Sequence, residues 1–376
     1  MNLYRKLVPE IIRTQIRNPQ YIFHDLKFLF RYLFSRAPEI QSTRDPEYQH
    51  SICYIIPTTN ITGGVAVVCE HLNRLQKLGF KCLIASYDNK TDLSWFPDQS
   101  VKVVPLKGNK DLIEKYNTVV ATGWITAYEL ILLNVKRKIY LVQSDETRFY
   151  PKGSYLKKRV KRTYSFPFEF ITIAKWLQIW LKENFDKDSH YVPNGINTDI
   201  FYPDKPLEPK PKNKKRILLE GAINLPFKGM KEAFEVVQDL DCEVWCVSYD
   251  GKPEPQWHCD RFFEKVPMNM MRRIYSSCDI LLKLSKVEGF FGPPLEMMAC
   301  GGVPIVAKVT GYDEYIIDGH NALVTESDNI PKTKKLLQKL IDDQKLYNLL
   351  KSNSQKTVKK MSWNKSILKL TSIIRK

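Results

Sequence analysis

The sequence predicts an α/β protein with two domains, each built on a parallel β-sheet that helices cover on both faces. Three observations lead to this fold class. The chain has 376 residues, which is enough for two domains of ordinary size. Short apolar runs of strand length alternate with helical patterns along both halves. Two of these strands, ending near residues 57 and 285, run through a glycine turn into a helix, as nucleotide-type α/β domains do at their opening.

Residues 1–49 differ from the rest of the chain in composition. Aromatic and aliphatic side chains crowd residues 21–34, and Lys27, Arg31 and Arg36 accompany them. This pattern predicts a basic amphipathic helix followed by a polar linker. Such a helix either lies in a membrane interface or packs on the first domain as an extension, and both arrangements need the same apolar face.

The first domain is predicted at residues 50–190. An apolar strand at 51–57 enters a turn at Gly63 and Gly64 and then a helix at 65–78. The turn is not the Gly-x-Gly-x-x-Gly fingerprint, so a dinucleotide site is not expected. Further strands are expected at 81–87, 101–106, 118–123, 139–143 and 170–174, and helices at 125–134 and 176–184.

The second domain is predicted at residues 191–363. Two prolines and an Asn-Gly pair at its start form a defined turn, and a charged, proline-rich run follows. A strand at 216–220 then leads into the turn 221–229. A further strand and helix are expected at 242–248 and 269–277, and Ser362 is a good N-cap for a last helix.

Residues 279–304 carry the densest set of local signals. An apolar run of strand length is followed by Gly289 and Gly292, which allow the backbone to bend and to approach a ligand closely. The two prolines that come next suit a helix start, which places Glu296 in the first turn. Two consecutive glycines then end the helix, and another strand follows.

Two carboxylates flank this glycine loop, Glu288 before it and Glu296 after it. A helix N-terminus with free N–H groups attracts phosphate. Carboxylates repel phosphate, and because an ionised carboxylate only accepts hydrogen bonds, sugar and ribose hydroxyls are its natural partners. Each glutamate alone could also be a solvated loop charge or could complement the helix dipole. Together they predict a site for a nucleotide sugar.

The spacing of these glutamates, within Glu-Gly-Phe-Phe-Gly-Pro-Pro-Leu-Glu-Met-Met-Ala-Cys-Gly-Gly-Val-Pro, resembles the E-x7-E signature of retaining GT-B glycosyltransferases of family 4. The resemblance covers about residues 51–376. It implies the GT-B fold, in which two Rossmann-like domains face each other across a cleft. The second domain would hold a nucleotide-diphosphate sugar as donor, with no cofactor required. The first domain would hold the acceptor, and residues 364–376 would cross back to it.

The resemblance also implies roles for single residues. Glu288 would be the catalytic glutamate beside the donor sugar, and Glu296 would hold the nucleotide ribose. Lys228 would neutralise the leaving diphosphate in a phosphate loop. The usual arginine of that loop is absent, and the sequence leaves open whether Lys283, Lys286 or Arg148 replaces it. The other implied donor contacts are Gly63, Gly64, Gly229, Val266, Phe290, Gly292, Pro294 and Leu295.

Residues 142–151 resemble a stretch of bacterial rhamnosyltransferases of surface-glycan assembly. They follow a predicted strand, where ligands bind in parallel sheets. Asp145, Glu146 and Arg148 are therefore acceptor-site candidates, and a plain solvated loop is the alternative. The resemblance makes dTDP-rhamnose the preferred donor. The acceptor would be a glycan or a lipid-linked glycan in cell-surface polysaccharide synthesis, and the anomeric configuration would be retained.

The formal charge of +17 needs a partner. Nucleic acid, anionic lipid and phosphorylated substrates are all compatible with it, but no nucleic-acid-binding motif accompanies the charge. No apolar run reaches the length of a membrane span, and no signal-peptide core opens the chain. We therefore expect a cytoplasmic protein, with the anionic inner face of the plasma membrane as the preferred partner surface. The eight cysteines are unpatterned and indicate free thiols, with Cys242 and Cys246 as buried strand residues.

Other functions need features that the sequence does not reveal. A sugar-nucleotide epimerase or a phosphorylase of the same fold would need acidic and histidine residues, or a pyridoxal lysine, that the sequence does not reveal. A basic non-enzymatic protein on membrane or nucleic acid would show only salt-dependent binding. Asp-x-Asp strings at 186–188 and 239–241 lie at helix ends, where aspartate is a common turn residue, so no metal site is expected.

Overall fold

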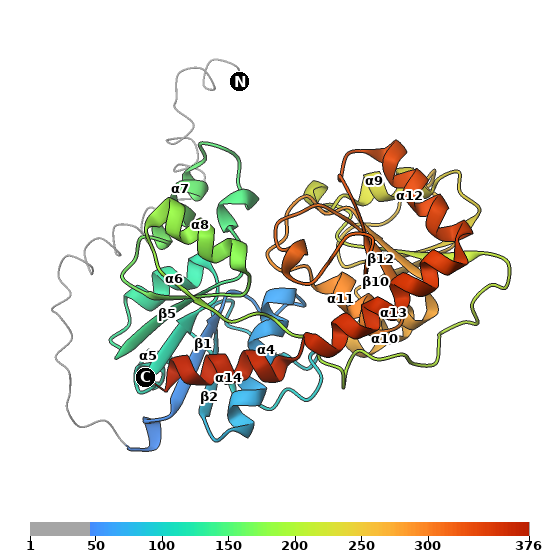
Figure 1. Cartoon of the computed structure of the whole chain (residues 1–376). Helices are drawn as coiled ribbons and strands as arrows, with labels where there is room; N and C mark the ends of the chain where they lie inside the picture. The colour runs from blue at the N-terminus through green and yellow to red at the C-terminus, as the bar shows by residue number, and fades with distance from the viewer. Residues whose placement is uncertain (1–45, 376) are drawn as a thin grey trace, which may run out of the picture. The chain divides into compact units, whose positions relative to one another are not determined.

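The computed structural model describes residues 46–375, which divide into two compact units (Figure 1). Among these residues, the first unit contains residues 46–93, 98–192 and 369–375. The second unit contains residues 94–97 and 193–368. The predicted amphipathic helix at residues 21–34 lies outside the described residues, which include only the last four residues, 46–49, of the predicted N-terminal extension.

The first unit is built on a seven-stranded sheet in which every neighbouring pair of strands is parallel. The strand order is β3-β2-β1-β4-β5-β6-β7, so the chain reverses direction across the sheet between β1 and β4. This is the doubly wound arrangement expected from the alternation of strands and helices. The strands are β1 (Ser51–Ile56), β2 (Lys81–Ser86), β3 (Val103–Pro105), β4 (Thr118–Ala121), β5 (Arg137–Val142), β6 (Glu169–Thr172) and β7 (His190–Tyr191).

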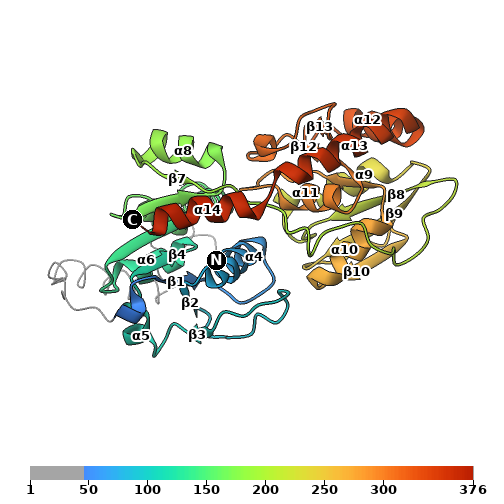
Figure 2. The same ribbon diagram turned by 60° about the horizontal axis from the view of Figure 1, so that its bottom comes forward.

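Local capping explains where several helices of this unit begin. The Thr62 hydroxyl accepts a hydrogen bond from the Val65 N–H at 3.2 Å and starts α4, and the Ser154 hydroxyl starts α7 in the same way. Helix α8 packs on β6 and β7 (Figure 2). The helices are η1 (Pro46–Tyr48), α4 (Gly63–Lys77), α5 (Lys110–Glu114), α6 (Trp124–Ile131), η2 (Glu146–Phe149), α7 (Tyr155–Thr163) and α8 (Lys175–Phe185).

The second unit repeats this plan with six parallel strands in the order β10-β9-β8-β11-β12-β13. The strands are β8 (Lys215–Glu220), β9 (Cys242–Ser248), β10 (Arg261–Glu264), β11 (Ile280–Lys283), β12 (Val303–Ala307) and β13 (Leu323–Thr325). The helices are η3 (Pro226–Lys228), α9 (Met230–Val237), α10 (Met268–Ser277), α11 (Gly292–Ala299), η4 (Tyr312–Glu314), α12 (Ile330–Asp342), α13 (Gln344–Lys360) and α14 (Trp363–Ile374).

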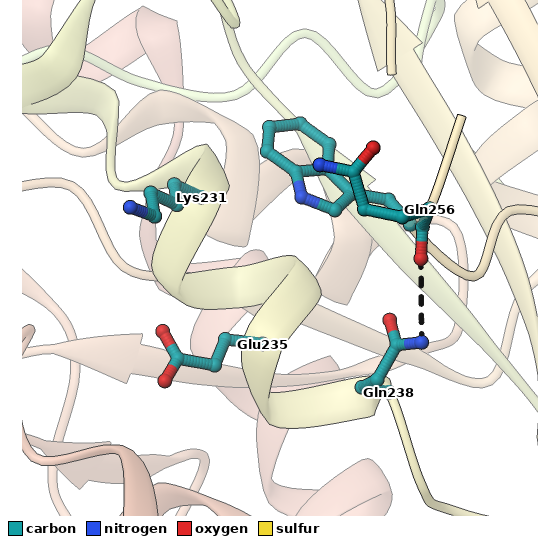
Figure 3. A pocket seen from close by; sticks show the side chains of 5 residues that line it. Lys231, Glu235, Gln238 and Gln256 are labelled. Atoms are coloured by element: carbon teal, nitrogen blue, oxygen red, sulfur yellow. Dashed lines mark hydrogen bonds between the residues drawn. The ribbon is translucent and has the colours of Figure 1, made fainter. Parts of the chain in front are cut away.

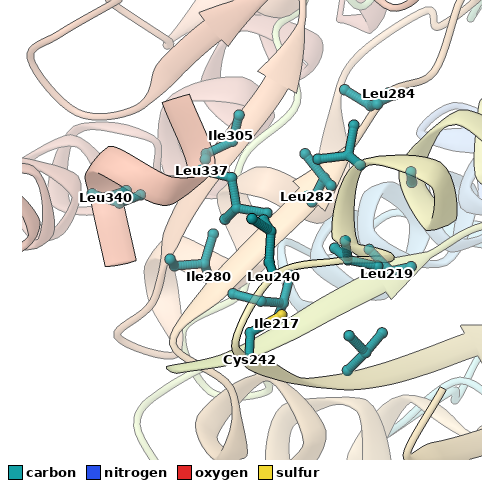
Figure 4. Close-up of a cluster of buried hydrophobic side chains, with 14 of the residues drawn as sticks. Ile217, Leu219, Leu240, Cys242, Ile280, Leu282, Leu284, Ile305, Leu337 and Leu340 are labelled. Carbon is teal, nitrogen blue, oxygen red and sulfur yellow. The ribbon is translucent and has the colours of Figure 1, made fainter. Parts of the chain in front are cut away.

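Alternation along β11 assigns its side chains to two faces of this sheet. Ile280 and Leu282 are buried on the face that α9 and α12 cover, in the core drawn in Figure 4. Because successive residues of a strand point to opposite faces, Leu281 and Lys283 lie on the other face, toward α10 and α11. Burying each of these aliphatic side chains stabilises the folded protein by about 1.5–3 kcal/mol relative to leaving the side chain in water. The same core contains Cys242 and Cys246, whose burial in a strand is confirmed.

The end of α11 agrees with the prediction that two glycines stop this helix. Gly301 adopts a left-handed φ of +89°, and the Gly302 N–H donates to the Met297 carbonyl at 3.0 Å. The Gly301 N–H donates to the Met298 carbonyl at 3.1 Å. These two bonds form a Schellman motif, which closes the helix and directs the chain into β12.

Helix α14 belongs to both units, because its residues up to Leu368 group with the second unit and those from Lys369 with the first. The Ser362 hydroxyl accepts a hydrogen bond from the Asn364 N–H at 3.2 Å, which confirms Ser362 as the N-cap. Between residues 46 and 375, no helix combines the length and the apolar character needed to cross a bilayer.

Candidate functional site

Two loops lie against each other at the carboxyl edge of the second unit's sheet. Residues 221–229 follow β8, and residues 284–292 follow β11, its neighbour in the sheet. The Lys286 N–H donates to the Phe227 carbonyl at 2.7 Å and ties the loops together. Gly229 has a φ of +65°, and a Cβ there would lie 2.0 Å from the Leu284 carbonyl oxygen. Only glycine fits this turn, because both the backbone angle and the space exclude a side chain.

Lys228 and Glu288, one from each loop, form an ion pair of 2.9 Å between Nζ and Oε1. Their side chains are 20% and 12% exposed, so the pair is mostly shielded yet reachable from solvent. The Thr310 hydroxyl donates to the Glu288 backbone carbonyl at 2.8 Å and fixes the loop from a third segment. A cation and a carboxylate separated by 60 residues of sequence thus stand side by side at one edge of the sheet.

Glu296 is the fifth residue of α11, not a first-turn residue, so this sequence expectation was wrong. The helix begins one residue before the prolines, at Gly292. The Tyr275 hydroxyl, from α10, donates to Glu296 Oε2 at 3.0 Å. Burial raises the pKa of Glu296 to about 7, the negative charge of Glu220 adds to the rise, and the Tyr275 bond and Lys283 oppose it.

Lys283 and Glu220 form a second, buried ion pair on the same side of the sheet. Strand β11 pairs with β8 in the register Leu282↔Leu219, so the next step places Lys283 opposite Glu220. The Lys283 side chain is 2% exposed, and its ammonium group donates to the Glu220 carbonyl at 2.8 Å and to the Glu220 carboxylate. Lys283 is therefore paired with Glu220 inside the protein.

The other two candidates for a second phosphate cation lie elsewhere. Lys286 pairs with Glu232 of α9, and its side chain is 40% exposed. Arg148 belongs to the first unit, where its guanidinium lies 5.5 Å from the centre of the Trp176 ring. Of the three candidates, Lys286 is the one exposed lysine of the second unit that extends from the loop carrying Glu288.

The start of α11 offers fewer free N–H groups than the sequence predicted. The Gly292 N–H donates to the Phe290 carbonyl at 3.0 Å, and the two prolines that follow have no N–H. The Tyr315 hydroxyl donates to the carbonyl of Phe291, the residue before this helix. The start of α11 therefore presents fewer donors to a phosphate than the sequence predicted, because one N–H is occupied and two residues have none.

The remaining predicted donor contacts of this unit differ in exposure. Phe290 is half-buried and its ring packs against that of Tyr315, with 5.6 Å between ring centres. Pro294 and Leu295 are buried, so they shape the loop through packing. Val266 is half-buried just after β10 and follows Lys265, whose φ of +51° turns the chain.

In the first unit, Gly63 and Gly64 are the first two residues of α4. Within the described residues, neither of their N–H groups has a hydrogen-bond partner, so this helix start is open to an anion. The Gln143 amide donates to the Gly64 carbonyl at 3.3 Å, which places the turn beside the end of β5. Gly63 has free space where a side chain would begin.

The acceptor candidates in the segment after β5 have internal partners. The Asp145 carboxylate accepts from the Thr147 N–H at 3.0 Å and caps η2. Glu146 Oε2 accepts from the Trp124 N–H and from the Tyr140 hydroxyl, both at 2.7 Å. Burial raises the pKa of Glu146 to about 7, although these two bonds oppose the rise. Both carboxylates thus hold local structure at the carboxyl edge of the first sheet.

An open hollow of about 490 Å³ lies along the outward face of α9 (Figure 3). It is lined by Lys231, Glu235, Gln238, Gln256 and Trp257. None of the predicted site residues is among them, and the Trp257 ring stacks on Phe234 with 4.5 Å between ring centres. The site therefore rests on the two loops and their ion pairs, where charged groups converge, and not on this hollow.

Sequence reasoning missed two partners of the central glutamates. Glu220 ends β8, and a carboxylate at the carboxyl end of a strand is a signal that could have been used. Tyr275 gives no such signal, because an aromatic residue in an amphipathic helix is usually part of the core.

Comparison with known proteins adds independent information. Residues 208–357 match the family model described as glycosyl transferases group 1, and this span includes Lys228, Val266, Glu288 and Glu296. An uncharacterized glycosyltransferase from Methanocaldococcus jannaschii is 26% identical over 230 residues, which cover 57% of this chain and 62% of that protein. The chain thus spans less than two thirds of this relative's length.

Two solved structures share the fold over most of the chain. Sucrose-phosphate synthase from Thermosynechococcus elongatus has a TM-score of 0.71 at 14% identity, over 87% of this chain and 98% of that one. HepE from Anabaena in complex with UDP-glucose has a TM-score of 0.72 at 12% identity, over 86% of this chain and 99% of that one. The chain therefore has the α/β GT-B fold, and its second unit contains a segment, residues 208–357, that is similar to group 1 glycosyl transferases.

Proposed function

We propose that this protein transfers a sugar from a nucleoside-diphosphate sugar to a hydroxyl group of a glycan acceptor, with retention of the anomeric configuration. One observation carries the proposal: Lys228 and Glu288 meet at 2.9 Å on the carboxyl edge of the second sheet, in the unit that also holds Glu296. Such an edge, at the point where strand order reverses, is where ligands bind in doubly wound sheets. Residues 191–363 would hold the donor, and residues 50–190 with 364–376 the acceptor.

The proposed reaction sets a clear electrostatic requirement. A bond forms between the acceptor oxygen and the anomeric carbon, and the bond from that carbon to the donor phosphate oxygen breaks. The electron pair leaves with the diphosphate, one of whose oxygens takes the acceptor proton. Lys228 stabilises the charge that grows on this leaving group, as a fixed cation in a shielded site does. Lys228 and Lys286 are the proposed phosphate ligands of the second unit, and Gly63 and Gly64 offer two open N–H groups to an anion in the first.

The carboxylates and the loop backbone supply recognition. Glu288 accepts hydrogen bonds from hydroxyls of the donor sugar, and Glu296 accepts them from the ribose. Val266 contacts the base. Phe290 and Gly292 line the sugar, and the buried Pro294 and Leu295 hold the loop in place.

Two nucleotide sugars are candidates for the donor. The resemblance to rhamnosyltransferases favours dTDP-rhamnose, whereas HepE, of similar fold, was solved with UDP-glucose. The acceptor is proposed to be a glycan or lipid-linked glycan of a cell-surface polysaccharide, with Arg148 as a contact. The charge of +17 favours peripheral binding to an anionic membrane face. Cosedimentation with phosphatidylglycerol vesicles that does not weaken as salt rises would contradict that placement.

The test combines binding with turnover. A thermal-shift panel of nucleotide sugars, including dTDP-rhamnose and UDP-glucose, should give one selective stabilisation, since a ligand stabilises by its affinity for the native state. Lys228→Ala and Glu296→Ala should each lower donor turnover by about 10²–10³-fold. Lys334→Ala is the matched control, because Lys334 forms a 2.8 Å ion pair with Asp239 on the surface of the same unit.

The products of the same assays separate the rival activities. Without acceptor, an epimerase would convert the donor to a new nucleotide sugar, and a phosphorylase would require added phosphate. Transfer that stays near the wild-type rate in both the Lys228 and the Glu296 variants would remove the proposed site.

A further inference from the structure

Tyr249 is an aromatic residue at the carboxyl edge of the second unit's sheet, directly after β9. It is 45% exposed, and within residues 46–375 its side chain forms no hydrogen bond and no ring contact. Single exposed apolar side chains are common on protein surfaces and need no function. What matters for Tyr249 is therefore which segments hold it and which groups surround it.

On one side, Tyr249 adjoins the segment that contains the proposed base contact. Strands β9 and β10 pair in the register Ser248↔Glu264. The Lys265 N–H donates to the Ser248 carbonyl at 3.0 Å and continues this pairing past the end of both strands. Val266 and Tyr249 therefore follow directly after two residues that a backbone hydrogen bond joins.

On the other side, the residue after Tyr249 is bonded to the loop that carries Lys228. The Ile223 N–H donates to the Asp250 carbonyl at 2.7 Å, and the Asn224 side-chain amide donates to the Asp250 carboxylate at 2.9 Å. The backbone at Tyr249 is thus held from both neighbouring strands, so its ring stands on a rigid support.

Alternation along β9 indicates the direction of the Tyr249 ring. Cys246 belongs to the core that α9 and α12 cover. Val247, the next residue, points to the opposite face, and it is paired in register with Glu220 of β8. Tyr249 follows Val247 by two residues, so it continues the row of side chains on the sheet face that also carries Lys283.

The electrostatic surroundings of the Tyr249 hydroxyl agree with this direction. Burial raises the pKa of Tyr249, and the negative charges of Glu220 and Asp250 add to the rise. Lys283 opposes the rise, and Glu288 adds to it. The hydroxyl end of the ring therefore lies toward the ends of β8 and β11, where the proposed sugar and diphosphate contacts are.

We propose that the Tyr249 ring is a platform on which the pyrimidine base of the donor stacks, so that the site selects a nucleotide over a bare diphosphate. The inference rests on the function proposed above, in which Val266 contacts the base and Lys228 the diphosphate. Tyr249 stands between the segments that carry these two residues. An aromatic ring stacks on the flat face of a base and leaves the hydrogen-bonding edge of the base free for backbone groups near Val266.

The experiment compares UDP and dTDP with their 5,6-dihydro forms, by isothermal titration calorimetry of the full-length protein. Saturating the 5,6 bond keeps the hydrogen-bonding edge of the base but removes its aromaticity and flatness, so the dihydro base cannot stack. Wild-type protein should bind UDP or dTDP about tenfold more tightly than the dihydro form. Tyr249→Ala should lose this preference, because its affinity for the aromatic form should fall by about tenfold. Tyr249→Phe should keep the preference, because the ring remains.

Tyr249→Leu supplies apolar volume without an aromatic ring and should also lose the preference. It keeps the experiment decisive if Tyr249→Ala does not fold. A purely structural role of Tyr249 predicts weaker binding of both forms with the preference retained. Tyr202→Ala is the control, because Tyr202 is an exposed tyrosine of the same unit whose ring lies 4.2 Å from the guanidinium of Arg272 in α10.

Lys228→Ala separates this inference from the function on which it rests. This variant should bind the aromatic and the dihydro forms more weakly by the same factor, because Lys228 acts on the diphosphate that they share. Weaker binding in Lys228→Ala, together with an unchanged preference in Tyr249→Ala and Tyr249→Leu, would overturn the inference and leave the donor site standing. Wild-type protein that binds neither UDP nor dTDP would overturn both.

Discussion

The geometry of single residues decides how tightly the two loops of the second unit can pack. Gly229 and Gly319 have nearly the same left-handed φ, +65° and +69°. At Gly229 a Cβ would lie 2.0 Å from a backbone oxygen, whereas at Gly319 nothing lies within 4 Å. The two positions therefore separate the cost of backbone strain from the cost of a steric clash.

Replacing these glycines by alanine should give two different losses of stability. Gly319→Ala should cost about 1 kcal/mol, the strain of a left-handed alanine. Gly229→Ala should cost about 3 kcal/mol or more, because the Leu284 carbonyl cannot move aside without disturbing the end of β11. Urea unfolding monitored by tryptophan fluorescence measures both. Equal losses would mean that the loops can separate freely at Gly229.

At the scale of elements, distant segments complete the ends of helices. Helix α6 begins at Trp124, and its N-terminal N–H group is satisfied by Glu146, which comes from the loop after β5. The Tyr140 hydroxyl binds the same carboxylate oxygen. A carboxylate at a helix N-terminus complements the helix dipole, so Glu146 joins α6 to the sheet edge.

Glu146 should make stability depend on pH in a defined direction. Its pKa is raised by burial from 4.5 to about 7 in the folded protein, so the folded state holds the proton more tightly than the unfolded state. The contribution of Glu146 to the free energy of unfolding is therefore fully present below about pH 4.5 and is lost as pH rises toward 7.

Thermal unfolding of the wild type and of Glu146→Gln between pH 4 and 8 measures this contribution. The variant should not lose stability through Glu146 as pH rises. The stability difference between wild type and variant should therefore change by a few kcal/mol between pH 4 and 8. Glu326→Gln, at an exposed site, serves as the control. A pH profile that is the same for wild type and Glu146→Gln would show that this carboxyl does not titrate in that window.

At the scale of the whole molecule, the last helix is shared by the two units. Leu370, Ile373 and Ile374 are buried, and they group with the first unit although the preceding residues of α14 group with the second. The Arg137 guanidinium donates to the Ile373 carbonyl at 2.7 Å. Within residues 46–375, the chain thus begins and ends in the first unit, and the second unit lies between these two parts in the sequence.

Ending the chain after Leu368 should weaken the first unit and spare the second. Loss of these three buried aliphatic side chains should cost the first unit about 4.5–9 kcal/mol of unfolding free energy, at 1.5–3 kcal/mol for each. Unfolding followed by hydrogen exchange of β1 and of β8 distinguishes the units. Leu368→Ala, at a side chain that is 69% exposed, is the control. Equal weakening of both strands would mean that the units unfold together.

Much of the fold could be predicted because its signals are local. All strands and helices expected by range between residues 51 and 308 are present, with ends that differ by up to three residues. Helix α7 was missed because its run Tyr155–Thr163 is dominated by lysine and arginine and contains few apolar residues from which a helical period could be recognised. Glu288 and Lys228 were named from a motif, yet their contact across 60 residues depends on the pairing of β8 with β11.

By itself, the sequence determined which segments become strands and helices and where glycine must stop or turn the chain, because periodicity and backbone angles are properties of neighbouring residues. Only the tertiary structure decided which side chains meet. Sheet register placed Lys283 opposite Glu220, and helix packing brought Tyr275 to Glu296. These contacts join residues far apart in the chain, and they form only when the sheets have fixed the position of every loop.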